Sequence, residues 1–135
     1  MTSATKEWYD LAVTDLGVVK HLNSTYYPKP LEIICYHCQQ AAEKSIKALI
    51  MYYGAQGGMP KLHDLSFLLN QIKNQVEIED KFYEYADTLT PYGVSIRYPN
   101  ELFLEERHAD KAIQYADEIV QWVSDIVNTS GDVST

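Results

Sequence analysis

Apolar residues recur along most of this chain at the three- and four-residue spacing of an amphipathic helix. Glycine and proline clusters interrupt the pattern, and no stretch shows the convincing alternation of a strand. The stretches between the interruptions predict helices at about residues 5–22, 31–53, 64–73, 79–89 and 106–127. Four substantial helices and one short one predict an all-α fold, an antiparallel up-and-down four-helix bundle with one additional short helix.

The predicted helices each carry one apolar face. In the first helix this face is Trp8, Leu11, Ala12, Leu16, Val19 and Leu22, with Asp15 interrupting it. In the last helix it is Ala109, Ala112, Ile113, Ala116, Ile119, Val120, Val123 and Val127. Small side chains allow helices to pack closely, so alanines at 41, 42, 48, 109, 112 and 116 predict close contact between the second and last helices.

Length and charge narrow the classes of protein. The chain has 135 residues, which suits one domain over residues 1–135, with its core at about 5–127 and a polar, frayed C-terminal tail. The net charge of −8 argues against broad binding to a phosphate backbone, but it allows a local basic pocket or a basic protein partner. No apolar run suits a membrane span or a signal peptide, so we expect a cytoplasmic protein without membrane contact.

The segment Cys35-Tyr36-His37-Cys38 has the spacing of half a zinc or redox motif. A structural zinc site needs four ligands, and the other histidines lie in separate elements. The two cysteines also stand more than a turn into the helix, and Cys38 continues its apolar stripe, where a free cysteine packs as a small hydrophobe. We therefore expect no metal and no cofactor, and we expect His37 to be a partly buried structural histidine.

Another face of the same helix carries Gln40, Glu43, Lys44 and Lys47, at positions i, i+3, i+4 and i+7. Glu43 and Lys47 have the spacing of a helical ion pair. Spacing alone favours a solvated face for these four residues.

Several short motifs together resemble the HEPN domain family (higher eukaryotes and prokaryotes nucleotide-binding). These are Gln40-Ala41-Ala42-Glu43-Lys44 with Lys47-Ala48, then His63-Asp64-Leu65, then Arg97-Tyr98-Pro99. The resemblance covers about residues 5–127. It implies an up-and-down helical bundle, often a homodimer, with a link to nucleotides or RNA. Many members are metal-independent ribonucleases, commonly toxins paired with a minimal nucleotidyltransferase.

Those ribonucleases share an Arg-x(4–6)-His motif, which this sequence lacks. Counting from Arg97, the histidine positions hold Leu102, Phe103 and Leu104, and counting from Arg107 they hold Ala112, Ile113 and Gln114. The resemblance therefore favours a noncatalytic domain that binds a nucleotide-like anion or a nucleotidyltransferase partner, as in a toxin–antitoxin module. The ligand-binding candidates are Arg97, Tyr98, Gln40, Glu43, Lys44 and Lys47.

Two alternatives stay open. One is a metal-independent ribonuclease toxin with a rearranged site, in which Arg97 works with His63 or His108 on RNA, since arginine can hold a phosphate and histidine can move a proton near neutral pH. The other is a structural subunit that serves only protein association. His63 also has a structural interpretation, in which it orients the start of the third helix while Asp64 caps that helix.

Overall fold

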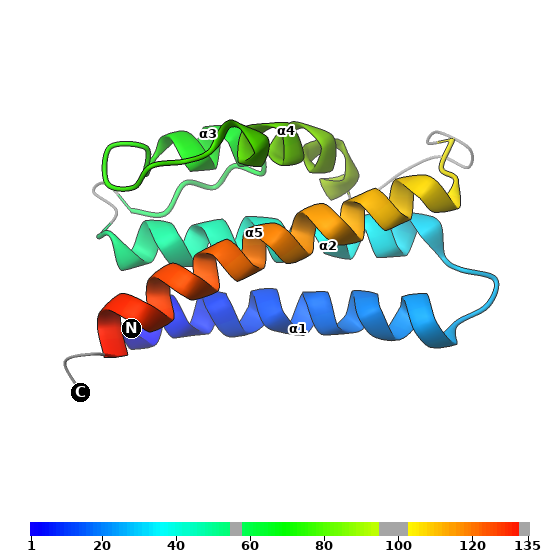
Figure 1. Ribbon diagram of the computed structural model, residues 1–135, viewed down its shortest axis with the longest axis horizontal. Coiled ribbons are helices and arrows are strands. Elements are labelled where there is room, and N and C mark those ends of the chain that lie inside the picture. Colours follow the sequence, from blue (N-terminus) through cyan, green and yellow to red (C-terminus); the bar gives the residue numbers. More distant parts are fainter. Residues whose placement is uncertain (55–57, 95–102, 133–135) are drawn as a thin grey trace.

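The computed structural model describes residues 1–54, 58–94 and 103–132 of the chain (Figure 1). These residues form helices and no strand, which confirms the predicted all-α class. The elements are α1 (Ser3–Thr25), α2 (Leu31–Tyr52), α3 (Leu65–Asn70), α4 (Asp80–Leu89), the short 3-10 helix η1 (Thr90–Gly93) and α5 (Glu106–Asp132).

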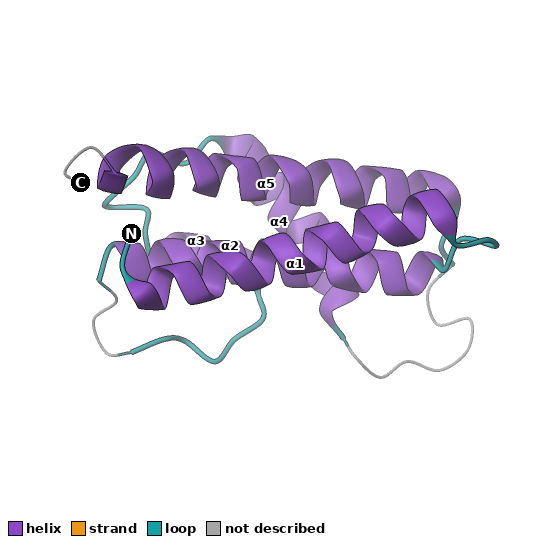
Figure 2. Cartoon of the chain, turned by 90° about the horizontal axis from the view of Figure 1, so that it is seen from below, coloured by secondary structure: helices purple, strands orange, loops and turns teal. Residues whose placement is uncertain are grey.

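Three long helices and a helical hairpin make up the bundle. α1 and α2 run antiparallel side by side, and α5 lies across them in the same direction as α2 (Figure 1). The short helices α3 and α4 lie along the other side of α2, and Figure 2 shows the same arrangement from below. The N-terminus and the end of α5 lie at one end of the bundle. α2 is therefore the central helix, with neighbours around most of its circumference.

The helix ends follow from local sequence. The side chain of Thr2 accepts a hydrogen bond from the Thr5 amide at 3.3 Å and caps α1. α2 ends just before Gly54, whose φ of 75° lies in the left-handed region that glycine enters at low cost. Asp64 caps α3 by accepting from the Phe67 amide at 3.2 Å, as the sequence predicts.

The C-terminal boundary differs from the prediction. α5 continues to Asp132, whereas the sequence predicts an end near residue 127 and a frayed tail. The Asn128 side chain donates to Ser124 Oγ at 3.0 Å, one turn earlier, which helps the helix continue. Polar residues of moderate helix propensity cost roughly tenths of a kcal/mol each and Gly131 about 1 kcal/mol, so an established helix can extend through this short stretch.

Side chains from all five α-helices contribute to one cluster of buried apolar residues. The alanines predicted to bring α2 and α5 together are 0–1% exposed, and the two helices pack directly against each other. The prediction for Leu11 is wrong, because the sequence pattern places this residue on the buried stripe of α1, whereas it is 48% exposed. Ile113 is only partly buried. No helix in the described part of the chain is long and apolar enough to span a membrane.

Candidate functional site

A buried polar network lies in the middle of α2, centred on the carboxylate of Glu43. One oxygen, Oε1, accepts from Gln39 Nε2 at 2.9 Å and lies 2.8 Å from His63 Nδ1. The other oxygen, Oε2, accepts from Lys47 Nζ at 3.0 Å. Glu43 is 4% exposed and Lys47 is 6% exposed, so this pair is an ion pair inside the bundle. The Glu43–Lys47 pair that the spacing predicts is confirmed.

The neighbouring helix α1 completes the surroundings of the two lysines. Trp8 places its ring 5.3 Å from Lys47 Nζ, close enough for a cation–π interaction. Asp15 accepts from Lys44 Nζ at 2.7 Å and lies 3.0 Å from His37 Nδ1. The carboxylate that interrupts the apolar stripe of α1 thus pairs with two groups of α2. The expected structural role of His37 is confirmed by this contact and by its partial burial.

The expectation of a solvated face on α2 is wrong for Glu43 and Lys47, and Lys44 is only partly exposed. Helical spacing shows which residues share a face, but it cannot show how many neighbours that face meets. Here α1 and the segment before α3 cover it. Gln40 lies at its edge, half-buried, and donates to Gln39 Oε1 at 2.7 Å.

The ionisation of Glu43 follows from these contacts. Burial by itself raises the pKa of a carboxyl group, because it penalises the charged form. Hydrogen bonds from Gln39, His63 and Lys47, together with the charge of Lys47, outweigh burial and hold the pKa of Glu43 below its usual value. Glu43 is therefore an anion at neutral pH. A carboxylate can only accept, so His63 carries its proton on Nδ1 and donates to Glu43.

η1 brings a second segment to this network. A side-chain carbon added to Gly93 would lie 2.6–2.9 Å from the amide group of Gln39, so only glycine allows so close an approach. The chain runs from Gly93 and Val94 into residues 95–102. The site candidates Arg97 and Tyr98 lie in that segment, outside the described residues.

The two histidines considered for catalysis lie in different elements. His63 precedes α3, and its side chain is 69% exposed although Nδ1 reaches buried Glu43. His108 lies in the first turn of α5, and its Nδ1 accepts from the Glu105 amide at 2.9 Å, which caps that helix. Each has its own local partner, and the described residues show no hydrogen bond between them.

The cysteines are both free and fully buried, which confirms that they pack in the core. Burial is the main cause that raises the pKa of Cys35 to about 12, and the charge of Glu32 adds to it. Burial raises the pKa of Cys38 as well. Both are thiols at neutral pH. Among the described residues, no three His, Cys, Asp or Glu side chains gather as metal ligands would. The absence of metal stays a prediction.

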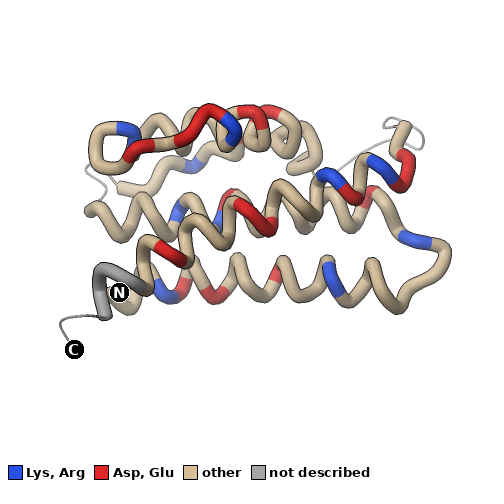
Figure 3. Tube along the Cα trace, viewed as in Figure 1, with Lys and Arg blue, Asp and Glu red and all other residues tan. Residues whose placement is uncertain are grey.

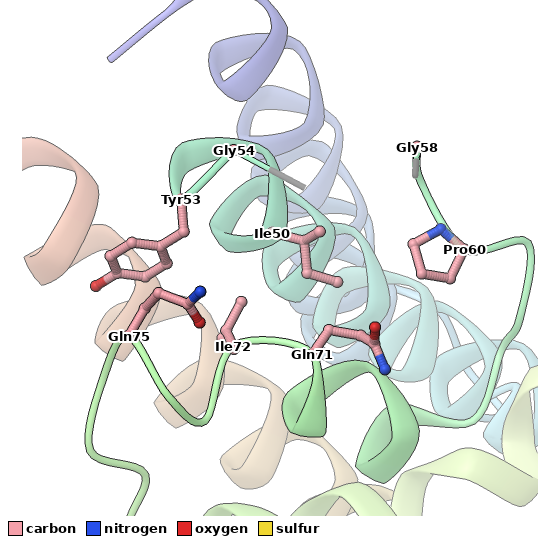
Figure 4. A pocket seen from close by; sticks show the side chains of 8 residues that line it. All are labelled: Ile50, Tyr53, Gly54, Gly58, Pro60, Gln71, Ile72 and Gln75. Carbon is pink, nitrogen blue, oxygen red and sulfur yellow. The ribbon is translucent and has the colours of Figure 1, made fainter. Parts of the chain in front are cut away.

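A hollow of about 320 Å³ lies at the C-terminal end of α2 (Figure 4). Ile50 and Ile72 form its apolar floor, and Tyr53, Gln71 and Gln75 add polar groups at its sides. None of the described lining residues is charged. An anion therefore has no counter-charge there, and the network around Glu43 is the stronger candidate site.

The model of the HEPN domain family matches residues 5–126, which span all five α-helices and the Glu43 network. The chain belongs to the HEPN domain family. This confirms the resemblance that the short motifs carry. No curated protein matches this chain.

Three solved structures resemble this HEPN domain along nearly its whole length. An archaeal HEPN homologue has a TM-score of 0.71 at 24% identity, and the match covers 92% of this chain and 97% of the other. A protein from Thermus thermophilus has a TM-score of 0.75 at 23% identity, with 92% and 98% covered. An HEPN domain protein from Thermotoga maritima has a TM-score of 0.66 at 24% identity, with 90% and 98% covered. At these identities the neighbours show the fold alone.

Sequence reasoning missed Gln39, the one polar residue of this HEPN network that is 0% exposed. Its side chain contacts Glu43 and Gln40 and also donates to the His63 carbonyl at 3.4 Å. A signal existed, because residues 39, 43 and 47 follow one another at intervals of four and form a single row along α2. Sequence reasoning selected Gln40 instead of its neighbour Gln39, because Gln40 lies at i, i+3, i+4 and i+7 spacing with Glu43, Lys44 and Lys47. That set was interpreted as a solvated face, so the row through Gln39 was missed.

Proposed function

We propose that this chain is a noncatalytic HEPN domain that binds a nucleotide-like anion or a nucleotidyltransferase partner, as in a toxin–antitoxin module. The observation that carries the proposal is the Glu43 network. It is a hydrogen-bonded cluster in the middle of the bundle, and Gly93, four residues before Arg97 in the sequence, packs against its Gln39. Preorganised polar groups would suit an anion if Arg97 joins them.

The charges of the network decide which residues would meet the anion. Lys44 pairs with Asp15 and Lys47 with Glu43, so the two lysines are already neutralised by carboxylates. The anion would then depend on Arg97, whose planar fork can hold two phosphate oxygens. Gln40 would add an amide at the rim. Tyr98 would stack on a base.

The overall charge fits a small ligand better than a long nucleic acid. The chain carries a net charge of −8. Figure 3 shows acidic residues gathered along α4 and the turn before it, and these are Glu77, Glu79, Asp80, Glu84 and Asp87. This segment, in which one lysine, Lys81, stands among the five carboxylates, would repel an extended phosphate backbone and attract a basic protein surface. Both consequences support the noncatalytic proposal over RNA cleavage.

The test compares arginine variants for binding and stability. Purified protein is titrated with AMP and ATP by calorimetry, and separately mixed with the product of any neighbouring nucleotidyltransferase gene. Arg97→Ala and Arg97→Lys should both lose nucleotide binding, because lysine lacks the bidentate fork. Arg107→Ala is the matched control, since Arg107 is 73% exposed and its partner among the described residues is Glu105 on the surface.

Unchanged binding in Arg97→Ala would remove Arg97 from the site. Absence of both nucleotide and partner binding in the wild type would contradict the proposed function and leave a structural subunit. Cleavage of RNA by metal-free wild type, lost in His63 or His108 variants, would show that the domain is a ribonuclease instead.

A further inference from the structure

His63 stands apart from the rest of the network because one side of its ring is buried and the other is open. Nδ1 donates to Glu43, 2.8 Å away, while the side chain as a whole is 69% exposed. Nε2 lies on the far side of the imidazole ring from Nδ1. Among the described residues Nε2 has no hydrogen-bond partner. A ring fixed at one nitrogen and open at the other presents a single oriented polar atom to solvent.

The charge around the ring depends on one proton. Glu43 and Lys47 form a neutral pair, so the cluster has no net charge while His63 is neutral. Protonation of Nε2 gives the cluster a net charge of +1 at its solvent side, with a donor at the surface. On the loop of His63, the charged neighbours are Lys61 and Asp64, and the Asp64 carboxylate turns toward the first turn of α3.

We propose that His63 Nε2 is a binding group for a small phosphate-type oxyanion, held in place by Glu43 and active in its protonated form. The imidazolium donates Nε2–H to one anion oxygen, and no covalent step is involved. The inference rests on the proposed function, which supplies the biological ligand, the phosphate of a nucleotide. The group that binds the anion is here His63, whereas the proposed function depends on Arg97. Only the protonated ring has an Nε2–H to donate while Nδ1 donates to Glu43, so binding of the anion should weaken as pH rises.

If His63 had a purely structural role, loss of Nε2 would not change anion binding. The substitution His63→Asn tests this. In His63→Asn the side-chain amide nitrogen is attached to Cγ, as Nδ1 is, so the variant keeps a donor toward Glu43, while it loses Nε2 and Cε1 and carries an oxygen in place of Cδ2. It should retain the wild-type melting temperature and lose anion binding. His63→Ala removes both groups and should lose stability as well, because it takes one partner from a buried carboxylate. His108→Asn is the matched control on α5.

The experiment follows the histidine ring resonances by NMR while sulfate is added at pH 6 and at pH 8, since the charge of sulfate is the same at both. His63 resonances, assigned from the His63→Asn spectrum, should shift at pH 6 and much less at pH 8. His63→Asn should weaken sulfate affinity at pH 6 by at least roughly tenfold, the effect of one hydrogen bond to a charged group. His108→Asn should bind like the wild type. Calorimetry with AMP on the same proteins gives the second measurement.

The outcomes separate this inference from the proposed function. If His63 resonances do not move with sulfate, or if His63→Asn binds as tightly as the wild type, the inference is wrong. If sulfate shifts His63 but AMP does not bind at all, the inference stands and the proposed nucleotide function fails. If AMP binds equally well to wild type and His63→Asn, the function stands and His63 is only a structural group.

Discussion

The contact between Gly93 and Gln39 allows a sharp test of how rigid the network is. In Gly93→Ala the added carbon would lie 2.6 Å from the Gln39 side chain, whereas ordinary contact begins at 3.4 Å. The Gln39 amide must therefore retreat by about 0.8 Å. It is held by bonds of 2.9 Å to Glu43 and 2.7 Å from Gln40, so a shift of that size breaks at least one of them.

The expected cost follows from that loss. Breaking a buried hydrogen bond and leaving its partner unsatisfied costs about 1–3 kcal/mol, and overpacking costs a similar amount. We expect Gly93→Ala to lower the free energy of unfolding by about 2 kcal/mol, which corresponds to a fall in melting temperature of roughly 8 °C for a domain of this size. Urea denaturation followed by circular dichroism measures the first quantity, and thermal denaturation the second.

The same chain offers a matched control. Gly17 lies within α1, and a side-chain carbon added there would meet nothing within 4 Å. Gly17→Ala should raise stability by up to about 1 kcal/mol, because alanine is the better helix former. If Gly93→Ala is as stable as the wild type, Gln39 moves freely, and the picture of a rigid network is refuted.

Three further predictions test other parts of the structure. At pH 8 an alkylating reagent should not modify Cys35 and Cys38 in the native protein but should modify both fully in denaturant, and the protein should contain no zinc. Each Cys→Ala change should lower the free energy of unfolding by on the order of 1 kcal/mol. Rapid alkylation of the native protein or stoichiometric zinc would contradict this. The pKa of Glu43 is lower in the folded than in the unfolded protein, where it is about 4.3, so its carboxylate stabilises the fold above that unfolded pKa. This stability is lost as pH falls through the lower pKa of the folded state. Glu43→Gln should therefore flatten the acid side of a curve of stability against pH. The resemblance also predicts a homodimer, so light scattering should give twice the 15.5 kDa chain mass, and a monomer would count against it.

The helices were predictable because apolar spacing and helix caps are local properties of the sequence. The apolar residues at helical spacing in α3 and α4, among them Leu65, Leu68, Phe82 and Leu89, are buried, and Asp64 caps α3 as expected. Leu11 shows the limit, since it shares the spacing of the stripe but is 48% exposed. Spacing fixes the face of a helix, whereas burial depends on what packs against that face.

The site was only partly predictable for the same reason. The sequence selects Glu43 and Lys47 as an ion pair, which is local, but it does not show that α1 and the His63 loop bury the pair. The links from Glu43 to His63 and from Gly93 to Gln39 join residues far apart in the sequence, so no helical period reveals them. In the sequence, only the resemblance to the HEPN family linked the motif of Glu43 with the motif of His63.

The buried ion pair raises the question of whether α2 keeps it for stability or for binding. Removing one partner of such a pair costs about 3–5 kcal/mol, but replacing both with apolar residues of similar size is often neutral or stabilising. Stability alone therefore gives weak reason to keep charges in a helix whose other buried positions are mostly apolar. A role in holding His63 and its neighbouring segment gives a stronger one.

A replacement of the whole row distinguishes the two reasons. The triple variant Gln39→Met, Glu43→Leu and Lys47→Met removes every buried polar side chain of the row at once and strands no charge inside the bundle. We expect its melting temperature to lie within a few degrees of the wild type, while sulfate and nucleotide binding are lost because His63 is no longer held. The single variant Lys47→Met is the control, and it should be clearly destabilised because it strands Glu43. If the triple variant is at least as unstable as the single one, the network is needed for folding. If the triple variant folds and still binds, the network is not the site.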